Sequence, residues 1–517
     1  MKRFFSLLLV CLLLLCGCAE NNAAESTAAT TGTEAVSGVS FSDRDYEVGY
    51  DEAECVHITL TGDSAQCDSD AVTISAGAIT VREAGDYLVS GTLADGMLIV
   101  EAGESDKVRL ILDGVALTSA TSAAIYVRSA DKVFLTTTVG SENVLANGGS
   151  YQAIDENNID AVIFSKADLT MNGEGSMEIN AAAGHGVVSK DELTVTSGSY
   201  TIQAEKHGLC GKDGAGIAGG SFTVSCGKDG VHSDGALVIT GGTLDITQSY
   251  EGLEGQTVEI SGGTVSLNAS DDGINAASPD ESSDFRSDAN AYIHISGGTV
   301  NIRAEGDGID SNGSLLVSGG EVYISGPTSG GNGSLDYAGS GTITGGVVVA
   351  VGSAQMAQNF GSDSTQGAIL LNVGRQQAGT AVSLAGSDGT TLVTYAAQCE
   401  YECVIVSAPE IRQGETYTVT AGETSQTVTM DSLIYGGGMG MPGGFGGHGG
   451  GGFGGGGFGG ERPDKGGDRT PPNGETPSGD MTPPNGEMPS GDMMPPDGEM
   501  PSDGMMGATP DAPEGNV

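Results

Sequence analysis

Carboxylates recur at nearly constant spacing through the middle of the chain, each followed by Gly and an aliphatic residue. The first series of these residues is Asp229, Glu251, Asp272 and Asp307. Three positions further on in each phrase lies a second series, His232, Glu254, Asn275 and Asp310, and Asp271 adds one more carboxylate. If the repeats stack as neighbouring β-strands about 4.8 Å apart, each series forms a row.

Rows of carboxylates at this spacing need a counter-ion or protons. Two such charges about 5 Å apart repel by roughly 3 kcal/mol at an effective dielectric constant of about 20. Carboxylate and amide oxygens are hard ligands, which suit calcium with about 6–8 of them. We therefore predict a Ca²⁺ site made from Asp229, Glu251, Glu254, Asp271, Asp272, Asn275, Asp307 and Asp310. The alternative is that each Asp-Gly pair only forms a turn, with Asp bonded to its own backbone and Gly at positive φ.

Lysines form two columns in the repeats that precede the acidic ones, Lys190 with Lys212 and Lys206 with Lys228. We predict that these columns bind the carboxylates of a uronate polymer. A lysine with a lowered pKa could instead be the general base of a polysaccharide lyase, and the candidates are Lys206, Lys212 and Lys228. A third interpretation is that these lysines are solvated charges at turns.

The same phrase opens earlier with His185 and His207 in place of the acid, and we interpret both as surface turn residues. Counted on the aliphatic residue after the Gly, from Val187 to Ile274, the repeats are 22, 22, 22 and 21 residues apart. The units are rich in Thr, Val and Ile and alternate with period 2, which excludes helical repeats. A period of about 20–25 residues with Gly-Gly turns is typical of one coil of a parallel β-helix.

The start of the chain is typical of an exported protein. Two basic residues precede an apolar run and the sequence Leu15-Cys16-Gly17-Cys18. Because the run is shorter than the ~20 residues of a membrane span, residues 1–18 are predicted to be a cleaved lipoprotein signal. Cys18 would then carry the lipid that anchors the protein to the membrane at the extracellular cell surface. The alternative is an ordinary secretory signal without lipid.

The rest of the chain divides into five parts. Residues 19–39 are small and polar and are predicted to form a flexible tether. An N-terminal β cap (40–95), the parallel β-helix (96–355) and a C-terminal β cap (356–435) are expected to follow. Residues 436–517 are Gly-rich and then repeat a Pro/Gly/Met/acidic unit, which is typical of disorder. The prediction is therefore an all-β solenoid with coils of about 22 residues, β caps and disordered termini.

Composition narrows the range of partners. With 20 basic and 68 acidic residues, the formal charge of −48 argues against nucleic acid or an anionic membrane as a partner. It favours a surface that binds cations. Six cysteines beyond the signal fall into near neighbours that could form disulfides outside the cytosol, Cys55/Cys67, Cys210/Cys226 and Cys399/Cys403.

Several phrases together resemble a known family. They are Lys228-Asp-Gly-Val-His-Ser-Asp-Gly235, Ser249-Tyr-Glu-Gly-Leu-Glu-Gly255, Ser270-Asp-Asp-Gly-Ile-Asn-Ala276, Gly306-Asp-Gly-Ile-Asp-Ser-Asn312 and Ser325-Gly-Pro-Thr-Ser-Gly-Gly-Asn-Gly333. From about Phe41 to Met430 the chain resembles the bacterial cell-surface carbohydrate-binding β-helix family first recognised in a cellulolytic clostridium. The resemblance implies a right-handed parallel β-helix similar to pectate lyases, with calcium bound by acids of these phrases. It also implies affinity for acidic plant polysaccharide such as polygalacturonate, or for cellulose, without catalysis.

We accordingly predict a non-catalytic, calcium-dependent polysaccharide-binding surface lipoprotein. The chain has no Trp and only 5% aromatic residues, whereas a flat crystalline glucan is usually held by aromatic faces. An anionic glycan is therefore favoured over cellulose. Two alternatives stay open: a calcium-dependent polysaccharide (pectate) lyase, and a structural spacer or adhesin in which acids and metal only reinforce the solenoid.

Overall fold

The computed structural model describes residues 38–279 and 287–437, and these residues form an all-β fold. Two short 3-10 helices, η1 (Asp43–Tyr46) and η2 (Glu52–Glu54), precede the first strand. Within these ranges, no helix is long and apolar enough to cross a membrane. The predicted signal with Cys18, nearly all of the tether, and the tail beyond residue 437 lie outside the described residues.

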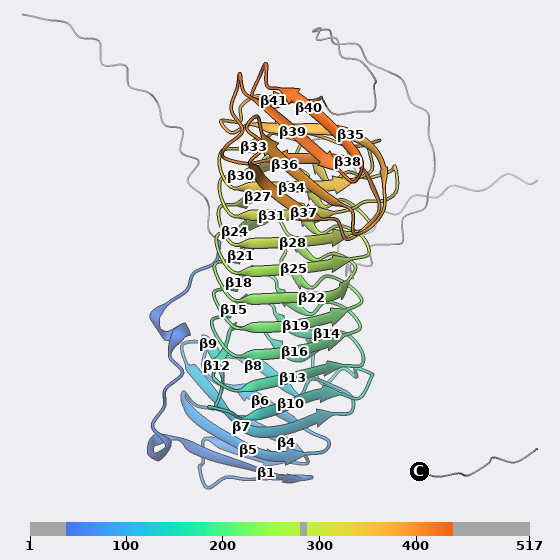
Figure 1. Ribbon diagram of the computed structural model, residues 1–517. Helices are drawn as coiled ribbons and strands as arrows, with labels where there is room; N and C mark the ends of the chain where they lie inside the picture. The colour runs from blue at the N-terminus through green and yellow to red at the C-terminus, as the bar shows by residue number, and fades with distance from the viewer. Residues whose placement is uncertain (1–37, 280–286, 438–517) are drawn as a thin grey trace, which may run out of the picture. The chain divides into compact units, whose positions relative to one another are not determined.

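Three strands separated by turns make up each repeat, and every strand pairs with its counterpart in the next repeat. One repeat consists of β14 (His185–Ser189), β15 (Glu192–Val195) and β16 (Ser199–Ala204), and the next of β17 (Leu209–Gly211), β18 (Gly214–Ile217) and β19 (Ser221–Cys226). The pairs β14–β17, β15–β18 and β16–β19 are all parallel and in register. The repeats therefore build three parallel stacks, of which the one containing β16 and β19 is visible as successive arrows in Figure 1.

The three stacks are named here after their strands in the first of these repeats. Besides β14 and β17, the β14 stack contains β4 (Ala78–Val81), β6 (Met97–Glu101), β8 (Ile125–Ser129), β11 (Ala161–Ser165), β20 (Val231–His232), β23 (Leu253–Gly255), β26 (Ile274–Ala276), β29 (Ile309–Ser311) and β32 (Leu335–Tyr337). The β15 stack also contains β9 (Lys132–Thr137), β12 (Asp168–Gly173), β21 (Ala236–Ile239), β24 (Thr257–Ile260), β27 (Tyr292–Ile295), β30 (Ser314–Val317) and β33 (Gly341–Ile343). The β16 stack also contains β10 (Glu142–Asn147), β13 (Ser176–Ala181), β22 (Thr243–Ser249), β25 (Thr264–Ala269), β28 (Thr299–Ala304), β31 (Glu321–Ser325) and β34 (Val347–Gly352).

One hydrophobic core runs along the repeats. Leu209 of the β14 stack, Ile217 of the β15 stack and Val224 of the β16 stack belong to the same buried cluster, as do their counterparts in neighbouring repeats. Along strands such as β16, β19 and β22, inward apolar side chains alternate with outward polar ones, as a sheet with one buried face requires. Each repeat thus buries its apolar residues against the repeats next to it.

Parallel pairing starts earlier than the predicted boundary at residue 96. β1 (Val56–Gly62) pairs in parallel with β5 (Gly85–Leu93), and β5 with the long strand β7 (Lys107–Ser119). β7 then pairs with both β9 and β10, so this one strand adjoins both the β15 stack and the β16 stack. Antiparallel pairing at this end is confined to the short strands β2 (Ala65–Gln66) and β3 (Val72–Ser75), which pair with β1 and β4. The residues predicted as a cap therefore largely continue the parallel sheets.

The C-terminal part is sandwich-like. β35 (Ala368–Gln376) and β38 (Tyr401–Ser407) extend the sheet of β34 in antiparallel fashion, and β41 (Ile434–Tyr435) pairs with β35. A separate antiparallel sheet consists of β36 (Ala381–Gly386), β37 (Thr391–Ala396), β39 (Thr416–Ala421) and β40 (Thr424–Thr429). Val351, Leu371 and Val406 from the first sheet pack with Leu384 and Val419 from the second, which gives this part its own core.

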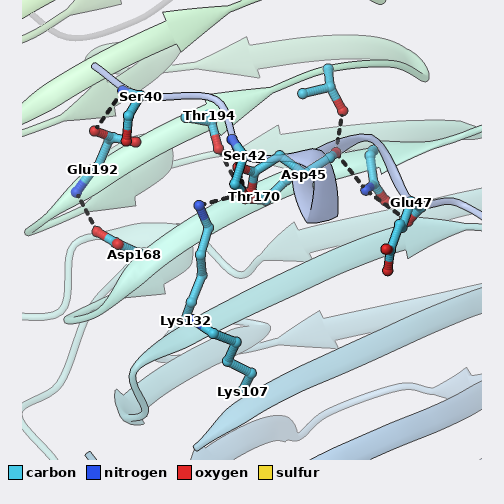
Figure 2. A network of polar contacts seen from close by, with 12 residues as sticks. Ser40, Ser42, Asp45, Glu47, Lys107, Lys132, Asp168, Thr170, Glu192 and Thr194 are labelled. Carbon is cyan, nitrogen blue, oxygen red and sulfur yellow. Dashed lines mark hydrogen bonds and ion pairs between the residues drawn. The ribbon is translucent and has the colours of Figure 1, made fainter. Parts of the chain in front are cut away.

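A strap of residues 38–50 crosses the outer face of the β15 stack. Its centre is Asp45, which is 0% exposed. The Asp45 carboxylate forms an ion pair with Lys132 (Nζ to Oδ1, 2.8 Å) and accepts a hydrogen bond from the hydroxyl of Thr170 at 2.5 Å (Figure 2). Although burial alone would raise the pKa of Asp45, its bonds to Lys132, Thr170 and Ser42 hold that pKa below the usual value.

None of the three cysteine pairs suggested by sequence proximity forms a disulfide, because all six described cysteines are free thiols. The side chain of Cys226 points into the main core, whereas Cys210 packs against a separate cluster that includes Tyr126 and Phe164. The thiol of Cys226 thus points toward the core, and that of Cys210 points away from it. Cys55 donates its thiol hydrogen to the carbonyl oxygen of Asp51 at 3.3 Å.

Candidate functional site

The two predicted rows of polar residues are present along the β14 stack. In the second row, His232 is in register with Glu254, Glu254 with Asn275, and Asn275 with Asp310. These residues alternate with buried Val231, Leu253, Ile274 and Ile309, so the row lies on the outer face of the stack. The row continues to Asp336, which is in register with Asp310.

The first row lies at the turn that leads into each strand. The N–H of the Gly in each phrase donates to the carbonyl oxygen of the next row member: Gly230 to Glu251, Gly252 to Asp272, and Gly273 to Asp307. This backbone ladder holds the four first-row acids above one another.

The glycines of the acid phrases are required by close packing and not by positive φ. Gly230, Gly252 and Gly273 are absent from the residues with φ in the left-handed region, whereas the second Gly of Gly-Gly turns, such as Gly242 and Gly263, lies there. A Cβ on Gly273 would lie 2.3 Å from Cγ2 of Ile302 and 2.5 Å from the oxygen of Gly308. The turn interpretation, with Gly at positive φ, is therefore wrong for these pairs. The Gly instead lets successive repeats approach closely.

Overlapping groups of ligand atoms run along the rows. Within each group the carboxylate or imidazole atoms all lie within 4.8 Å of one another, and the groups are His207/Asp229/His232, Asp229/Glu251/Glu254, Glu251/Asp271/Asp272 and Asp272/Asp307/Asp310. Every carboxylate predicted to bind metal therefore belongs to at least one group. Asp229, Glu251 and Asp272 each belong to two, so the groups form a continuous band.

Asn275, the one predicted ligand that is an amide, lies inside this band and is 7% exposed. Its Nδ2 donates a hydrogen bond to Oε2 of Glu251 at 3.0 Å. Its Oδ1 is buried and has no hydrogen-bond partner among the described residues. Because buried amide oxygens are nearly always paired, this atom needs a donor or a cation.

Burial and neighbouring negative charges disfavour the ionised form of three acids in the band. Burial, followed by the charges of Asp271, Asp307 and Asp310, raises the pKa of Asp272 to about 8. Burial, with the charges of Glu254 and Asp229, also raises the pKa of Glu251 well above its usual value. For Asp307, burial is the main cause of a pKa of about 6. A cation placed among these oxygens would favour their ionised forms.

At the other end of the band, imidazoles accompany the carboxylates. Burial alone would raise the pKa of Asp229, but hydrogen bonds with His207 and His232 hold it well below its usual value. Burial lowers the pKa of His207. Both histidines are therefore part of the band. His207 lies at a turn, as predicted, with its side chain 18% exposed, whereas His185, also predicted as a surface turn residue, is buried within β14.

The four predicted lysines lie on both sides of the β14 stack. One column lies just before the first row and is linked by backbone hydrogen bonds; its members are Lys206, Lys228, Tyr250 and Asp271. Lys190 and Lys212 follow the strands β14 and β17, at the opposite end of the strands. Lys206 approaches Asp160 (Nζ to Oδ2, 3.7 Å), and Lys190 lies over the ring of Phe164 at 5.4 Å. The two lysine columns are thus separate sites.

An open cavity of about 450 Å³ lies beside the column of Lys206 and Lys228. Its polar lining comes from one row of the β16 stack, in which Asn180, Gln203, Ser225 and Gln248 are successive register partners. Glu205 and Gly227, which immediately precede the two lysines, complete that wall. Sequence analysis missed this row, although its spacing of 23, 22 and 23 residues was readable.

Comparison with known proteins identifies the family. Residues 75–326 and 225–389 match the family described as carbohydrate-binding domain-containing protein, and these spans together cover more than half of the chain. The chain belongs to this carbohydrate-binding domain family.

One member of this family, a carbohydrate-binding domain-containing protein of Acetivibrio thermocellus, is 33% identical over 150 residues, which are 28% of this chain. The chain spans about half the length of that relative, 52%. A solved structure, the polysaccharide lyase-like protein from C. thermocellum as a gadolinium derivative, is similar at 27% identity with a TM-score of 0.41, covering 51% of this chain and 96% of that chain.

An exposed aromatic ring joins the cavity to the acid band of this family member, and sequence analysis missed it too. Tyr250 is 40% exposed and follows Gln248 by two residues. Lys228 Nζ lies 5.9 Å from the centre of its ring. A hydrogen bond with Asp271 raises the pKa of Tyr250.

Proposed function

We propose that this protein is a non-catalytic, calcium-dependent receptor for acidic polysaccharide such as polygalacturonate. In this proposal the parallel stacks close into a right-handed parallel β-helix. A lipid on Cys18 would anchor the protein at the extracellular cell surface. Membership in a carbohydrate-binding family supports the polysaccharide partner, while the metal, the polymer and the anchor are parts of the proposal.

The observation that best supports the proposed metal site is the buried Oδ1 of Asn275, which has no hydrogen-bond partner among the described residues. Calcium takes about 6–8 oxygen ligands and accepts amide and carboxylate oxygens together. The neighbours that supply the remaining oxygens are Glu251, Asp271, Asp272, Asp307 and Asp310, which occupy two overlapping groups. The raised pKa values of Glu251, Asp272 and Asp307 indicate that these carboxylates lack a neighbouring positive charge. A calcium ion would satisfy the amide oxygen and neutralise the carboxylates at once.

In this proposal, the polysaccharide binds in the cavity along the β16 stack. The side chains of Asn180, Gln203, Ser225 and Gln248 offer hydrogen-bond donors and acceptors in one row, and rows repeat about every 4.8 Å along a parallel sheet. A linear polymer running along the stack would meet the same groups in each repeat. Lys206 and Lys228, beside this wall, would pair with carboxylates of the polymer, and Tyr250 would contact a sugar face.

The test is electrophoresis of the purified full chain through gels cast with polygalacturonate, with calcium or with chelator. The same mixtures are followed for ultraviolet absorbance of unsaturated sugar ends. We expect retardation in calcium, little retardation in chelator and flat absorbance.

Each other outcome selects a different function. Rising absorbance would identify a lyase and direct attention to Lys206, Lys212 and Lys228. Calcium-dependent thermal stability without retardation by any acidic glycan would identify a structural spacer or adhesin. Retardation that is equal in chelator would remove calcium from the binding function.

A further inference from the structure

The imidazole end of the band carries a second kind of chemistry, because three histidine rings stack there. The rings of His185 and His207 are 4.8 Å apart between centroids, and those of His207 and His232 are 4.5 Å apart. Asp229, which is 3% exposed, lies among them. Imidazole nitrogen is a preferred ligand of zinc and other transition metals, whereas calcium takes oxygen.

His185 shows how an imidazole in this column satisfies itself. Its Nδ1 accepts a hydrogen bond from the backbone N–H of His207 at 3.3 Å. The ring proton is therefore on Nε2, which lies 3.4 Å from Oδ2 of Asp160. One nitrogen accepts and the other donates, so a neutral ring suffices and no further cation is needed.

His207 repeats the first contact but not the second. Its Nδ1 accepts from the backbone N–H of Asp229 at 3.2 Å. The same Nδ1 lies only 2.9 Å from Oδ2 of Asp229. An imidazole nitrogen carries either a proton or one lone pair, so Nδ1 of a neutral His207 can satisfy only one of these two contacts.

His232 meets the same oxygen from the other side. Its Nε2 lies 3.2 Å from Oδ1 of Asp234, to which it donates. In a neutral ring, Nδ1 would then present a lone pair to Oδ2 of Asp229 at 3.0 Å and to Oε2 of Glu254 at 2.7 Å. Three short contacts thus link four ligand atoms in succession: Nδ1 of His207, Oδ2 of Asp229, Nδ1 of His232 and Oε2 of Glu254.

We propose that these four atoms bind a divalent transition-metal ion of the Zn²⁺ class. Two imidazoles and two carboxylates form a four-coordinate set, whose ligands at about 2.0–2.2 Å from the metal lie roughly 3.3–3.6 Å from each other. The contacts of 2.7 to 3.0 Å would need to open by about 0.3–0.9 Å. Asp234 holds Nε2 of His232 as the outer carboxylate of a carboxylate–histidine–metal triad.

This site is separate from the proposed calcium ligands around Asn275 and does not rest on polysaccharide binding. It reassigns Asp229 and Glu254, which the sequence analysis grouped with the calcium ligands. The competing possibility is that His232 is an imidazolium that donates from both nitrogens, so that a proton takes the place of the metal.

The experiment titrates the full chain with Zn²⁺ by calorimetry in the presence of excess Ca²⁺, and with Co²⁺ followed by absorption. We expect one Zn²⁺ to bind per chain despite the Ca²⁺, and Co²⁺ to give the intense ligand-field bands of a four-coordinate site. His207→Gln and His232→Gln should lose both signals. Asp234→Asn should weaken Zn²⁺ binding by roughly 10–100-fold, as loss of an outer carboxylate does.

The matched controls are His185→Gln, in the same imidazole stack, and Asp272→Asn, in the calcium group, and both should keep the Zn²⁺ signal. Thermal melts in chelator show whether each variant folds. If the histidine variants do not fold, the Co²⁺ spectrum of the natural chain in Ca²⁺ decides alone. Zn²⁺ binding that Ca²⁺ abolishes, that survives in both histidine variants, or that is absent would overturn the proposal, and absence would favour the imidazolium.

Discussion

Replacing Asp272 with Asn should change the stability of the protein in opposite directions with and without calcium. Asp272 shares one group with Asp271 and another with Asp307, with ligand atoms within 4.8 Å. Two full charges at 4.8 Å repel by about 3.5 kcal/mol at an effective dielectric constant of about 20. The new amide can still accept the hydrogen bond that Oδ1 of Asp272 accepts from the N–H of Asp307 at 2.6 Å. Without metal, the variant should therefore be more stable, by about 1–3 kcal/mol once partial protonation is allowed for.

In calcium the order should reverse. An ion that binds only the folded protein stabilises it by about 2.7 kcal/mol at a concentration of about 100 times Kd. The Asp272→Asn variant lacks one charged ligand and should lose most of that gain.

Urea unfolding at neutral pH, with calcium and with chelator, measures both differences. Asp245→Asn is the matched control, because Asp245 is exposed on β22 outside all four groups, and it should change neither value by more than about 0.5 kcal/mol. If Asp272→Asn lowered stability equally in both conditions, the reasoning from charge crowding and metal binding would be refuted.

Three further predictions concern the strap, the cavity and the packing of the repeats. Asp45→Asn should cost about 3–5 kcal/mol in urea unfolding at neutral pH, since it leaves a buried lysine without its charged partner. Because the pKa of Asp45 is lowered from 3.8, the carboxylate stabilises the fold above that pH, and this contribution should fade as pH falls below it. Gln203→Ala with Gln248→Ala, both exposed, should reduce retardation in polygalacturonate gels without changing the melting temperature. Gly273→Ala should destabilise by about 1–3 kcal/mol or more through overpacking in thermal melts, whereas Gly331→Ala, with open space around its Cα, should be nearly neutral.

The rows of acids could be predicted because, in a parallel stack, residues at equivalent positions of successive repeats lie next to each other in space. Asp272 and Asp307 are 35 residues apart, yet their phrases match, and the backbone ladder places them in successive repeats. The role of Gly273 could not be predicted in the same way. A sequence shows that a Gly is present but not whether φ or close packing requires it.

Side-chain direction explains other differences. Cys210 follows inward Leu209 and must point outward, whereas Cys226 lies two residues after inward Val224 and must point inward. This alternation was readable and argues against their disulfide. Asp45 had no such signal, because its contact with Thr170 spans 125 residues and belongs to no repeat.

The band acts as one electrostatic unit, since its members are shared between groups. Asp229 is common to the imidazole group and the first acid group, and Glu251 and Asp272 link the groups that follow. Removing a charged carboxylate from one repeat therefore also lowers the repulsion between the acids of the next repeat. Neighbouring substitutions such as Asp229→Asn and Glu251→Gln should be non-additive by about 0.5–3 kcal/mol, because they act on shared partners. If both proposed metal sites exist, parallel stacking gives one band two metal preferences. Imidazoles are present at one end and only oxygen ligands at the other, so the ligand atoms change while the backbone ladder does not.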